Sequence, residues 1–391
     1  MPERTFDVAL LGATGFTGAL TAAEIAARAP ADLRWALAGR SLQKLEAVRE
    51  RVVAAAPAGA PAPELVIADV TDPASLAELA ASTRVLTTTV GPYALHGAPV
   101  VAACAEHGTG YLDLTGEPEF ADRMYCAHHA RAVETGARIV HACGFDSIPH
   151  DLGAQFAVEQ LPEGVPLTVR GYVRGGGRIS GGTFASALTG FSRPRQNYAA
   201  AKARRAAEPP RDPGRSVRPD AGRPHRARGF WAVPLPTIDP QVVARSARAL
   251  ERYGPEFRYG HYAAVKRLPI AVGGAAGVMG LVAAAQIGPV RRGLLSKLPQ
   301  GDGPTDAQMA AGWFSVTMVG EGGGRRVVTE VRGGDPGYRE TSRMLADATL
   351  CLALDDLPET AGQVTTAQAL GPKLRERLIA SGIRFDVLER G

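Results

Sequence analysis

Short apolar runs alternate with stretches of helical spacing through residues 1–151. The first run, Phe6 to Leu11, leads into an Ala-rich helical pattern from Thr17 to Ala29. Further strands are predicted at Arg34 to Ala38, Leu65 to Ala68, Val85 to Val90, Tyr111 to Leu114 and Arg138 to His141. Further helices are predicted at Leu42 to Val53, Pro73 to Ala81, Pro99 to His107 and Pro118 to Thr135. Strands with helices between them pair in parallel through right-handed crossovers, so this part is predicted to be a doubly wound Rossmann domain of the α/β class.

The pattern changes after Leu152. Strands are predicted at Leu167 to Val173, Phe257 to Tyr262, Trp313 to Val319 and Arg326 to Val331, which together indicate a mostly antiparallel sheet in a second, α+β domain over 152–337. Helices are predicted at Thr183 to Arg205, Tyr338 to Leu354 and Thr365 to Ser381, and those of 338–391 are expected to pack back on the first domain. The stretch Pro209 to Arg228 is dense in Pro, Arg and Gly, which predicts a mobile surface loop.

One charge-free segment, Leu268 to Val290, is long enough to cross a bilayer. It carries five glycines and is rich in Ala rather than Leu, and charged residues flank it instead of aromatic anchors. Three alternatives stay open: a buried or homodimer-interface helix, the wall of a greasy channel or a membrane-surface contact, and a transmembrane helix. The first is favoured and the last is the weakest.

The turn after the first strand has the spacing of a dinucleotide site, with Gly12, Gly15 and Gly18 in Gly-x-x-Gly-x-x-Gly. The first glycine permits the tight turn, the second permits close approach of a pyrophosphate, and the third permits close packing of the helix. The helix N-terminus then offers free N–H donors to the phosphates. We therefore predict that this turn binds cofactor through Gly12, Thr14, Gly15, Phe16, Thr17 and Gly18.

The second predicted strand ends at Arg40 and Ser41, about where the ribose-reading residue of such domains lies. A guanidinium there suits the 2′-phosphate of NADP, whereas an acid would suit NAD, so NADPH is the predicted cofactor. The alternative is a solvated arginine at a strand end. Asp69 ends the third strand, where it is predicted either to border the adenine or only to cap the next helix.

Other polar residues follow the fourth, fifth and sixth predicted strands, at the sheet edge where ligands of such folds bind. Val90, Gly91, Pro92 and Tyr93 are expected to lie against ribose or nicotinamide, and Tyr93 and His96 are candidate proton donors unless they only pack. Asp113 and Glu117 are expected to orient substrate, or Thr115 or Glu117 to cap a helix. Asp146 and Ser147 are expected either to close over nicotinamide or to cap the next helix. On position alone, the candidate catalytic residues are Tyr93, Asp146 and Ser147.

Composition narrows the function only slightly. The net charge is +5, but without interleaved basic and aromatic residues it does not indicate nucleic-acid binding. The cysteines Cys104, Cys126, Cys143 and Cys351 lack zinc-ligand spacing, so no metal site is predicted, and they are expected to be reduced, buried thiols in a cytoplasmic protein. A predicted strand containing Asp7 stands where a signal peptide would have its apolar region. Membrane association is kept as an alternative because of 268–290.

Several motifs, in this order, resemble the saccharopine dehydrogenase-like oxidoreductases, and most of all the trans-acting enoyl reductases of lipid and polyketide pathways. They are Gly12-Ala-Thr-Gly-Phe-Thr-Gly18, Ala38-Gly-Arg40, Val90-Gly-Pro-Tyr93, Tyr111-x-Asp113-x-Thr-Gly-Glu117 and Gly144-Phe-Asp-Ser-Ile-Pro149. The resemblance reappears at Gly181-Gly-Thr183, Tyr338-Arg-Glu-Thr341 and Ala369-Leu-Gly371, so it covers nearly the whole chain.

The resemblance implies an NADPH-binding Rossmann domain, a second domain that holds substrate, and hydride transfer to an α,β-unsaturated acyl thioester. The charge-free 268–290 segment would suit an acyl chain, and the basic surface would suit an acidic acyl carrier protein or polyketide synthase. Two alternatives remain: an oxidoreductase acting on an amino-acid or other polar substrate, and an NADPH-binding membrane or lipid interaction protein without catalysis. The polar substrate is disfavoured because the arginines are expected in the 209–228 loop, away from the pocket.

Overall fold

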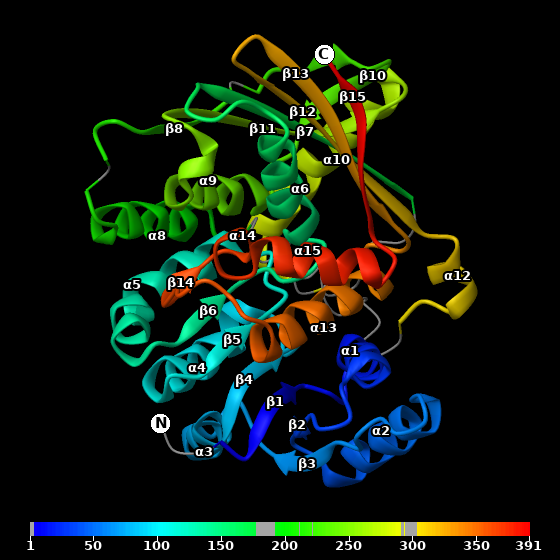
Figure 1. Cartoon of the computed structure of the whole chain (residues 1–391). Helices are drawn as coiled ribbons and strands as arrows, with labels where there is room; N and C mark the ends of the chain where they lie inside the picture. The colour runs from blue at the N-terminus through cyan, green and yellow to red at the C-terminus, as the bar shows by residue number, and fades with distance from the viewer. Residues whose placement is uncertain (1–3, 177–191, 211, 221, 291–292, 294–302) are drawn as a thin grey trace.

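The first of two sheets is parallel and consists of seven strands in the order β14-β6-β5-β4-β1-β2-β3 (Figure 1). The computed structural model describes residues 4–176, 192–210, 212–220, 222–290, 293 and 303–391. The strands of this sheet are β1 (Phe6–Leu11), β2 (Trp35–Gly39), β3 (Glu64–Ile67), β4 (Thr83–Thr88), β5 (Gly110–Leu112), β6 (Arg138–Val140) and β14 (Gly362–Val364). The predicted class, a Rossmann sheet with a second α+β part, is confirmed.

Helices cover both faces of this sheet, which is why its central strand is apolar at nearly every position. All six residues of β1 are buried; Val8 and Leu10 pack into one core, and Ala9 and Leu11 pack into another on the opposite face. The helices between these strands are α1 (Phe16–Arg28), α2 (Leu42–Ala55), α3 (Pro73–Ser82), α4 (Tyr93–His107) and α5 (Pro118–Thr135). Helix α4 begins at Tyr93 instead of the predicted Pro99, which lies inside it.

The second sheet has eight strands and is mixed, with the order β15-β13-β12-β7-β11-β10-β9 and β8 paired to β11. Its strands are β7 (Leu167–Gly176), β8 (Ser216–Pro219), β9 (His225–Ala227), β10 (Phe230–Pro234), β11 (Glu256–Val265), β12 (Trp313–Gly322), β13 (Arg325–Gly333) and β15 (Arg384–Arg390). Only the pairings of β11 with β7 and with β8 are parallel. The prediction of a plain loop at Pro209 to Arg228 was wrong, because β8 and β9 form within it and gain backbone partners on β11 and β10.

Of the remaining helices, some lie between strands of the second sheet and others connect the two sheets. They are α6 (Ile148–Glu159), α8 (Pro194–Ala207), α9 (Asp239–Ala249), the 3-10 turn η1 (Glu251–Tyr253), α10 (Leu268–Gln286), α12 (Asp306–Ala310), α13 (Arg339–Leu354), α14 (Thr366–Ala369) and α15 (Gly371–Ala380). The helix predicted over 365–381 is therefore two helices. The first part of the predicted 183–205 helix, with the Gly181-Gly-Thr183 motif, lies outside the described residues. Sequence alone also did not predict α9, β10, β14 or β15. The expectation that all four cysteines are buried was wrong for Cys126, which is exposed on α5.

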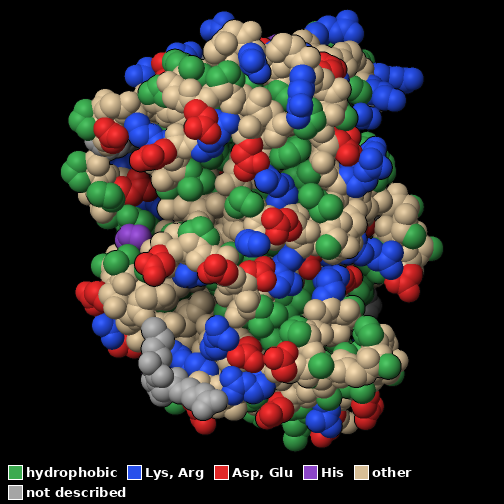
Figure 2. Space-filling view, viewed as in Figure 1, with side chains coloured by type: hydrophobic (Ala, Val, Ile, Leu, Met, Phe, Trp, Pro, Cys, Tyr) green, Lys and Arg blue, Asp and Glu red, His purple; other side chains and the backbone are tan. Residues whose placement is uncertain are grey.

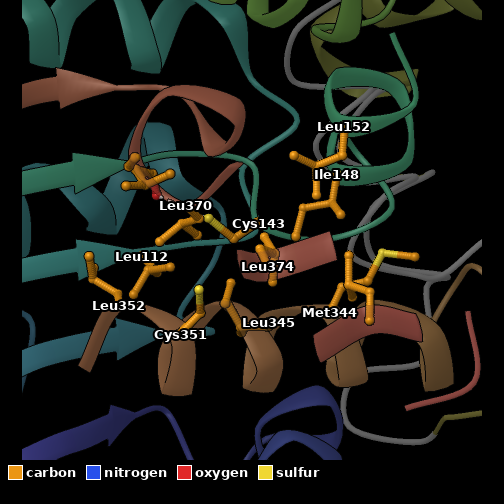
Figure 3. Close-up of a cluster of buried hydrophobic side chains, with 14 of the residues drawn as sticks. Leu112, Cys143, Ile148, Leu152, Met344, Leu345, Cys351, Leu352, Leu370 and Leu374 are labelled. Atoms are coloured by element: carbon orange, nitrogen blue, oxygen red, sulfur yellow. Dashed lines mark hydrogen bonds between the residues drawn. The ribbon is translucent and has the colours of Figure 1, made fainter. Parts of the chain in front are cut away.

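Helices α13 and α15 bring the last part of the chain against both halves of the molecule. Figure 3 shows Met344, Leu345 and Cys351 of α13 facing a cluster that includes Leu112 of β5, Ile148 of α6 and Leu374 of α15. Strand β14 then completes the first sheet beside β6, and β15 completes the second beside β13. The domain boundaries at 151 and 337 stay a prediction, since residues beyond 337 contribute to both sheets.

Helix α10 covers most of the charge-free segment. Its described side chains are mostly exposed, and a Cβ added at Gly273, Gly274, Gly277 or Gly280 would meet nothing within 4 Å. Of the favoured alternative, a buried or homodimer-interface helix, burial within the chain was therefore wrong for these residues, while the interface is not tested. None of the described helices is both long enough and apolar enough to cross a bilayer. Contact of this segment with a second copy or a membrane surface stays a prediction.

Candidate functional site

The glycine turn between β1 and α1 has a backbone that the glycines leave uncovered by side chains. Gly12 has φ of +87°, and a Cβ there would come within 2.7 Å of the Val90 side chain. At Gly18 a Cβ would lie 2.2 Å from the carbonyl oxygen of Gly12, so only glycine lets α1 pack this closely. Gly15 differs, because it is exposed, has ordinary extended φ and ψ, and would place a Cβ no closer than 3.4 Å to another atom. Space thus remains over Gly15 for a ligand.

Helix α1 presents unused donors to that space. Its N-cap is Gly15, no side chain caps it, and no acidic residue stands in its first turn. Phe16 packs edge-on against Tyr338 at 5.0 Å between ring centroids, and the Thr17 carbonyl accepts a hydrogen bond from Ser342. The N-terminal part of α13 therefore steadies the turn from behind, and the turn fits a pyrophosphate.

The residues predicted to read the ribose lie at the carboxyl ends of β2 and β3. Arg40 is exposed directly after β2. The Ser41 hydroxyl accepts a hydrogen bond from the Lys44 N–H at 3.4 Å and so caps α2. Asp69 is bonded to the backbone and hydroxyl of Thr71, and these bonds, followed by the nearby Arg40 charge, lower the pKa of Asp69. Asp72, rather than Asp69, caps α3.

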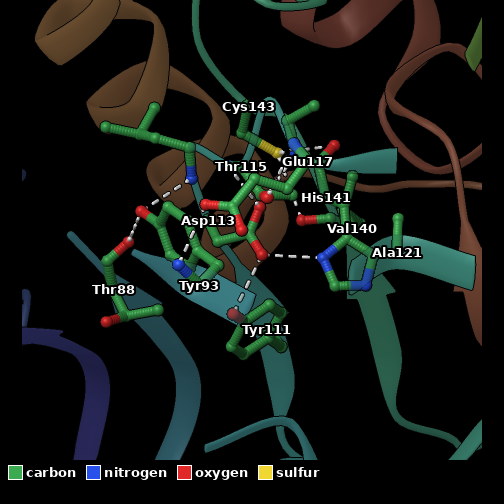
Figure 4. A network of polar contacts seen from close by, with 12 residues as sticks. Thr88, Tyr93, Tyr111, Asp113, Thr115, Glu117, Ala121, Val140, His141 and Cys143 are labelled. Atoms are coloured by element: carbon green, nitrogen blue, oxygen red, sulfur yellow. Dashed lines mark hydrogen bonds and ion pairs between the residues drawn. The ribbon is translucent and has the colours of Figure 1, made fainter. Parts of the chain in front are cut away.

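Asp113 is the centre of a buried polar network after β5 (Figure 4). One of its carboxylate oxygens accepts from the Tyr111 hydroxyl at 2.9 Å and contacts Nδ1 of His141 at 2.7 Å. The other oxygen accepts from the backbone N–H groups of Thr115 and Ala142 at 3.0 and 2.9 Å. Four partners saturate the carboxylate, so Asp113 fixes the ends of β5 and β6 instead of orienting substrate.

Glu117 serves the neighbouring helix. Its carboxylate accepts from the backbone N–H groups of Tyr93 and Ala94 at 3.1 and 2.9 Å, at the start of α4, which has no capping side chain of its own. A carboxylate at this end of a helix also interacts favourably with the helix dipole. Glu117 is thus a helix cap, which was one of the two alternatives in the sequence analysis. Its side chain caps α4 and not α5, the helix that follows Glu117 in the chain.

The three predicted catalytic residues lie in different surroundings. The Tyr93 hydroxyl is buried; it donates to the Thr88 carbonyl and accepts from the Leu114 N–H, both at 3.1 Å, and burial raises its pKa well above the ordinary value. Ser147 is also fully buried, and its Oγ has no hydrogen-bond partner among the described residues. His96 is half-buried at the start of α4. A catalytic role for Tyr93 or Ser147 stays a prediction, and this geometry favours structural roles for both.

Of the three predicted catalytic residues, Asp146 has the position most suitable for donating a proton. It is half-buried, and its carboxyl lies 3.2 Å from where a Cβ would stand on Gly116, at the carboxyl end of β5. Burial raises the pKa of Asp146 to about 7; the negative charge of Asp239 adds to this effect, while His150 opposes it. The adjacent Phe145 ring packs on Phe314 of β12 at 5.0 Å, and its N–H donates to the Thr341 hydroxyl. The loop therefore sets a protonatable group near Gly116 and within the electrostatic influence of Asp239 and His150.

A cavity of about 370 Å³ lies between α5, α8, α9 and β14. Its cationic lining is Arg204, Arg215, Arg245 and Arg248. Nε2 of His141 and Oε1 of Gln363 are buried in its walls and have no hydrogen-bond partner among the residues that the structure describes. Arginines therefore also gather outside the 209–228 loop, where the sequence analysis expected them to concentrate. Helices α8 and α9 contribute three of these four arginines, which their dispersed sequence positions did not reveal.

Comparison with known proteins places this arrangement in a family. Residues 8–140 match the model of the saccharopine dehydrogenase NADP binding domain. The chain is 39% identical to a Mycobacterium tuberculosis protein provisionally named a trans-acting enoyl reductase, and 35% identical to a trans-acting enoyl reductase of Mycobacterium ulcerans, over 97% of both partners in each case. Among solved structures, the apo saccharopine dehydrogenase (L-Glu forming) of Saccharomyces cerevisiae shares the fold, with a TM-score of 0.56, 13% identity and coverage of 98% and 99% of the two chains.

Replacing Gly15 with valine should remove cofactor binding without unfolding the protein. The side chain would occupy the space over the turn but would clash with nothing in the protein, so we expect NADPH affinity to fall at least 100-fold and the Tm to change by about 2 °C or less. Fluorescence titration with NADPH and thermal melting measure the two effects. Gly18→Val is the matched contrast, since its Cβ would strike the Gly12 carbonyl and should lower stability itself. Normal NADPH affinity in Gly15→Val would contradict the assignment.

Replacing Asp113 with asparagine should destabilise the fold. The amide nitrogen would face donors where an acceptor stood, so we expect a loss of about 3 kcal/mol in the free energy of unfolding. Urea unfolding measures it. Asp69→Asn, which changes only a local turn bonded to Thr71, is the control and should cost under about 1 kcal/mol. Equal losses in the two variants would show that the Asp113 network does not hold the strand ends.

Proposed function

Because this chain belongs to the saccharopine dehydrogenase-like oxidoreductases, the family that includes the trans-acting enoyl reductases, we propose that it reduces an α,β-unsaturated acyl thioester. It is an NADPH-dependent oxidoreductase. The observation that carries the proposed reaction is the likeness to the enoyl reductases through both sheets and not the nucleotide domain alone. The position of Asp146 between the sheets adds independent support.

The residues of the first sheet would hold the cofactor, which supplies a hydride when bound. The main-chain donors from Gly12 to Gly18 would bind its pyrophosphate, with Thr14, Phe16 and Thr17 bordering it. Arg40 would bind the 2′-phosphate with Ser41 nearby, and Asp69 would border the adenine side. The backbone of Val90, Gly91 and Pro92, which begins at the end of β4, would lie against the nicotinamide half.

We propose that Asp146 donates the proton that the reduction requires. A carboxyl with a pKa of about 7 carries a proton in roughly half of the molecules at neutral pH, so it can donate one to the α-carbon as negative charge develops on the thioester. Phe145 and Phe314 would exclude water beside it. Tyr93 would position the neighbouring backbone and would not donate a proton, because its hydroxyl links Thr88 at the end of β4 to Leu114 after β5.

An acidic carrier protein, alone or within a polyketide synthase, is the proposed partner. Lys and Arg side chains gather at the upper end of the face in Figure 2, over the second sheet. A groove of about 510 Å³ on this sheet is lined by Arg170, Arg223, Arg226, Arg228 and Arg326, together with Tyr172 and Tyr262. Acidic residues of the chain pair with some of these arginines, so the groove would attract an acidic partner mainly through Arg223 and Arg226. With such a partner, we also propose that the protein acts in the cytoplasm.

The arginine-lined cavity favours a second candidate function. In it the protein would reduce a substrate that carries carboxylates, such as an amino-acid derivative. Guanidinium groups bind carboxylates with two parallel hydrogen bonds. However, Arg204 is bonded to Glu208, Arg245 to Asp122, and Arg215 to backbone carbonyls, so their capacity for a ligand is partly used. The acyl thioester therefore stays the first proposal.

Replacing Arg40 with aspartate should change the cofactor preference. Loss of the guanidinium and gain of a negative charge should weaken NADPH about 10- to 100-fold and leave NADH nearly unchanged, since NADH lacks the 2′-phosphate. Fluorescence titration with each cofactor measures this. Arg49→Asp, an exposed change on α2, controls for the general loss of positive charge. Equal weakening of both cofactors would place Arg40 away from the phosphate.

The proposed reaction is tested by mixing the protein, NADPH and crotonyl- or longer enoyl-thioesters, then following the loss of NADPH absorbance. Turnover of enoyl thioesters is expected, and turnover only with carboxylated imino or keto substrates would favour the second candidate. Asp146→Asn should lower kcat about 100-fold without changing NADPH affinity, because it removes the proton source but not the glycine turn. Tyr93→Phe is compared in parallel. A larger loss of kcat in Tyr93→Phe than in Asp146→Asn would reverse the assignment.

A further inference from the structure

Three buried side chains from distant parts of the chain converge behind the Phe145–Asp146 loop. His150 lies in the first turn of α6, Asp239 begins α9, and His261 lies on β11. Each offers one donor atom, and these atoms all lie within 4.8 Å of one another. No other group of three such side chains in the described ranges meets this condition. The exposed fractions are 1%, 1% and 6% for His150, Asp239 and His261, so water does not solvate the donors.

The donor atoms are also unsatisfied. Nδ1 of His150, Oδ1 of Asp239 and Nε2 of His261 each lack a hydrogen-bond partner within the described part of the chain. His150 Nδ1 and Asp239 Oδ1 are 3.1 Å apart, which is the distance of an ion pair when His150 is protonated. Buried polar atoms without partners cost about 1–3 kcal/mol each, so three that meet at one point need a common partner.

The spacing fits a metal ion. Zinc binds histidine nitrogen and carboxylate oxygen at about 2.0–2.2 Å, and a tetrahedral angle then separates neighbouring ligand atoms by about 3.3 Å. The observed separations are 3.1 Å from His150 Nδ1 to Asp239 Oδ1 and 3.5 Å from His261 Nε2 to Asp239 Oδ2, and one ligand atom from each of the three residues lies within 4.8 Å of the other two. From this geometry we propose that His150, Asp239 and His261 bind one divalent first-row transition ion of the zinc class.

The neighbouring contacts orient the ligands as metal sites require. The Tyr259 hydroxyl lies 3.2 Å from Nδ1 of His261, which leaves Nε2 for the ion. The Thr237 hydroxyl donates to Oδ2 of Asp239, which leaves Oδ1. Such outer contacts fix ligand orientation in metal sites. The ion would join α6, α9 and β11 and would hold the start of α6, three residues after Ser147.

Metal binding is measured on the full chain. After removal of metal with a chelator and dialysis against Zn²⁺, elemental analysis should find one equivalent per chain, and the Tm should rise by about 3 °C at a hundredfold excess over Kd. Co²⁺ in its place should give the visible spectrum of a low-coordinate nitrogen and oxygen site. None of these readouts uses the reduction reaction, so they stand whether or not that reaction is the right one.

His261→Gln and His150→Gln should lose the bound equivalent, the Co²⁺ spectrum and the Tm rise, while His128→Gln, a half-buried histidine on α5, should keep all three. All forms are compared at one pH, because protons compete with the ion for the histidine nitrogens. The competing arrangement is an imidazolium of His150 paired with Asp239, which needs no ion. A wild-type chain that retains no metal and whose Tm does not respond to Zn²⁺ or Co²⁺ overturns the proposal, even if a variant fails to fold.

Discussion

The Asp113 carboxylate determines the geometry of the site more than any other single group. It accepts hydrogen bonds from side chains and backbone of β5, β6 and the loops that follow them. Those loops carry Glu117, which caps α4, and Asp146, which is the proposed proton donor. A neutral side chain could not satisfy four donors in a buried position, so the local arrangement depends on this one negative charge.

The nucleotide turn was predictable because its chemistry is local. Gly12, Gly15 and Gly18 follow an apolar strand directly, Gly12 has a positive φ, and a Cβ on Gly18 would strike the Gly12 carbonyl. The parallel strands were predictable for a similar reason, since strands buried on both faces appear as short apolar runs. Strand β14 at the edge of the first sheet was not predictable, because it is only three residues long and its partner β6 lies more than 200 residues earlier.

The chemistry between the sheets was less accessible from sequence. Asp113 was expected to orient substrate, but its hydrogen-bond partner His141 lies 28 residues away and carries no local signal. The arginine-lined cavity and the His150, Asp239 and His261 cluster combine residues from separate helices and strands. The Pro-, Arg- and Gly-rich composition of 209–228 predicted a loop, but two strands form there because they pair with β10 and β11. Local propensity does not contain these long-range pairings.

Strands β14 and β15 have a consequence for how the protein reaches its native state. Each is the terminal strand of a different sheet, and the residues they pair with, Arg138 and Arg332 among them, emerge from the ribosome well before them. Until the late strands arrive, β6 and β13 keep open edges that another chain could pair with. Folding of this protein should therefore finish only after translation has passed both strands, and nascent chains should depend on chaperones that shield sheet edges.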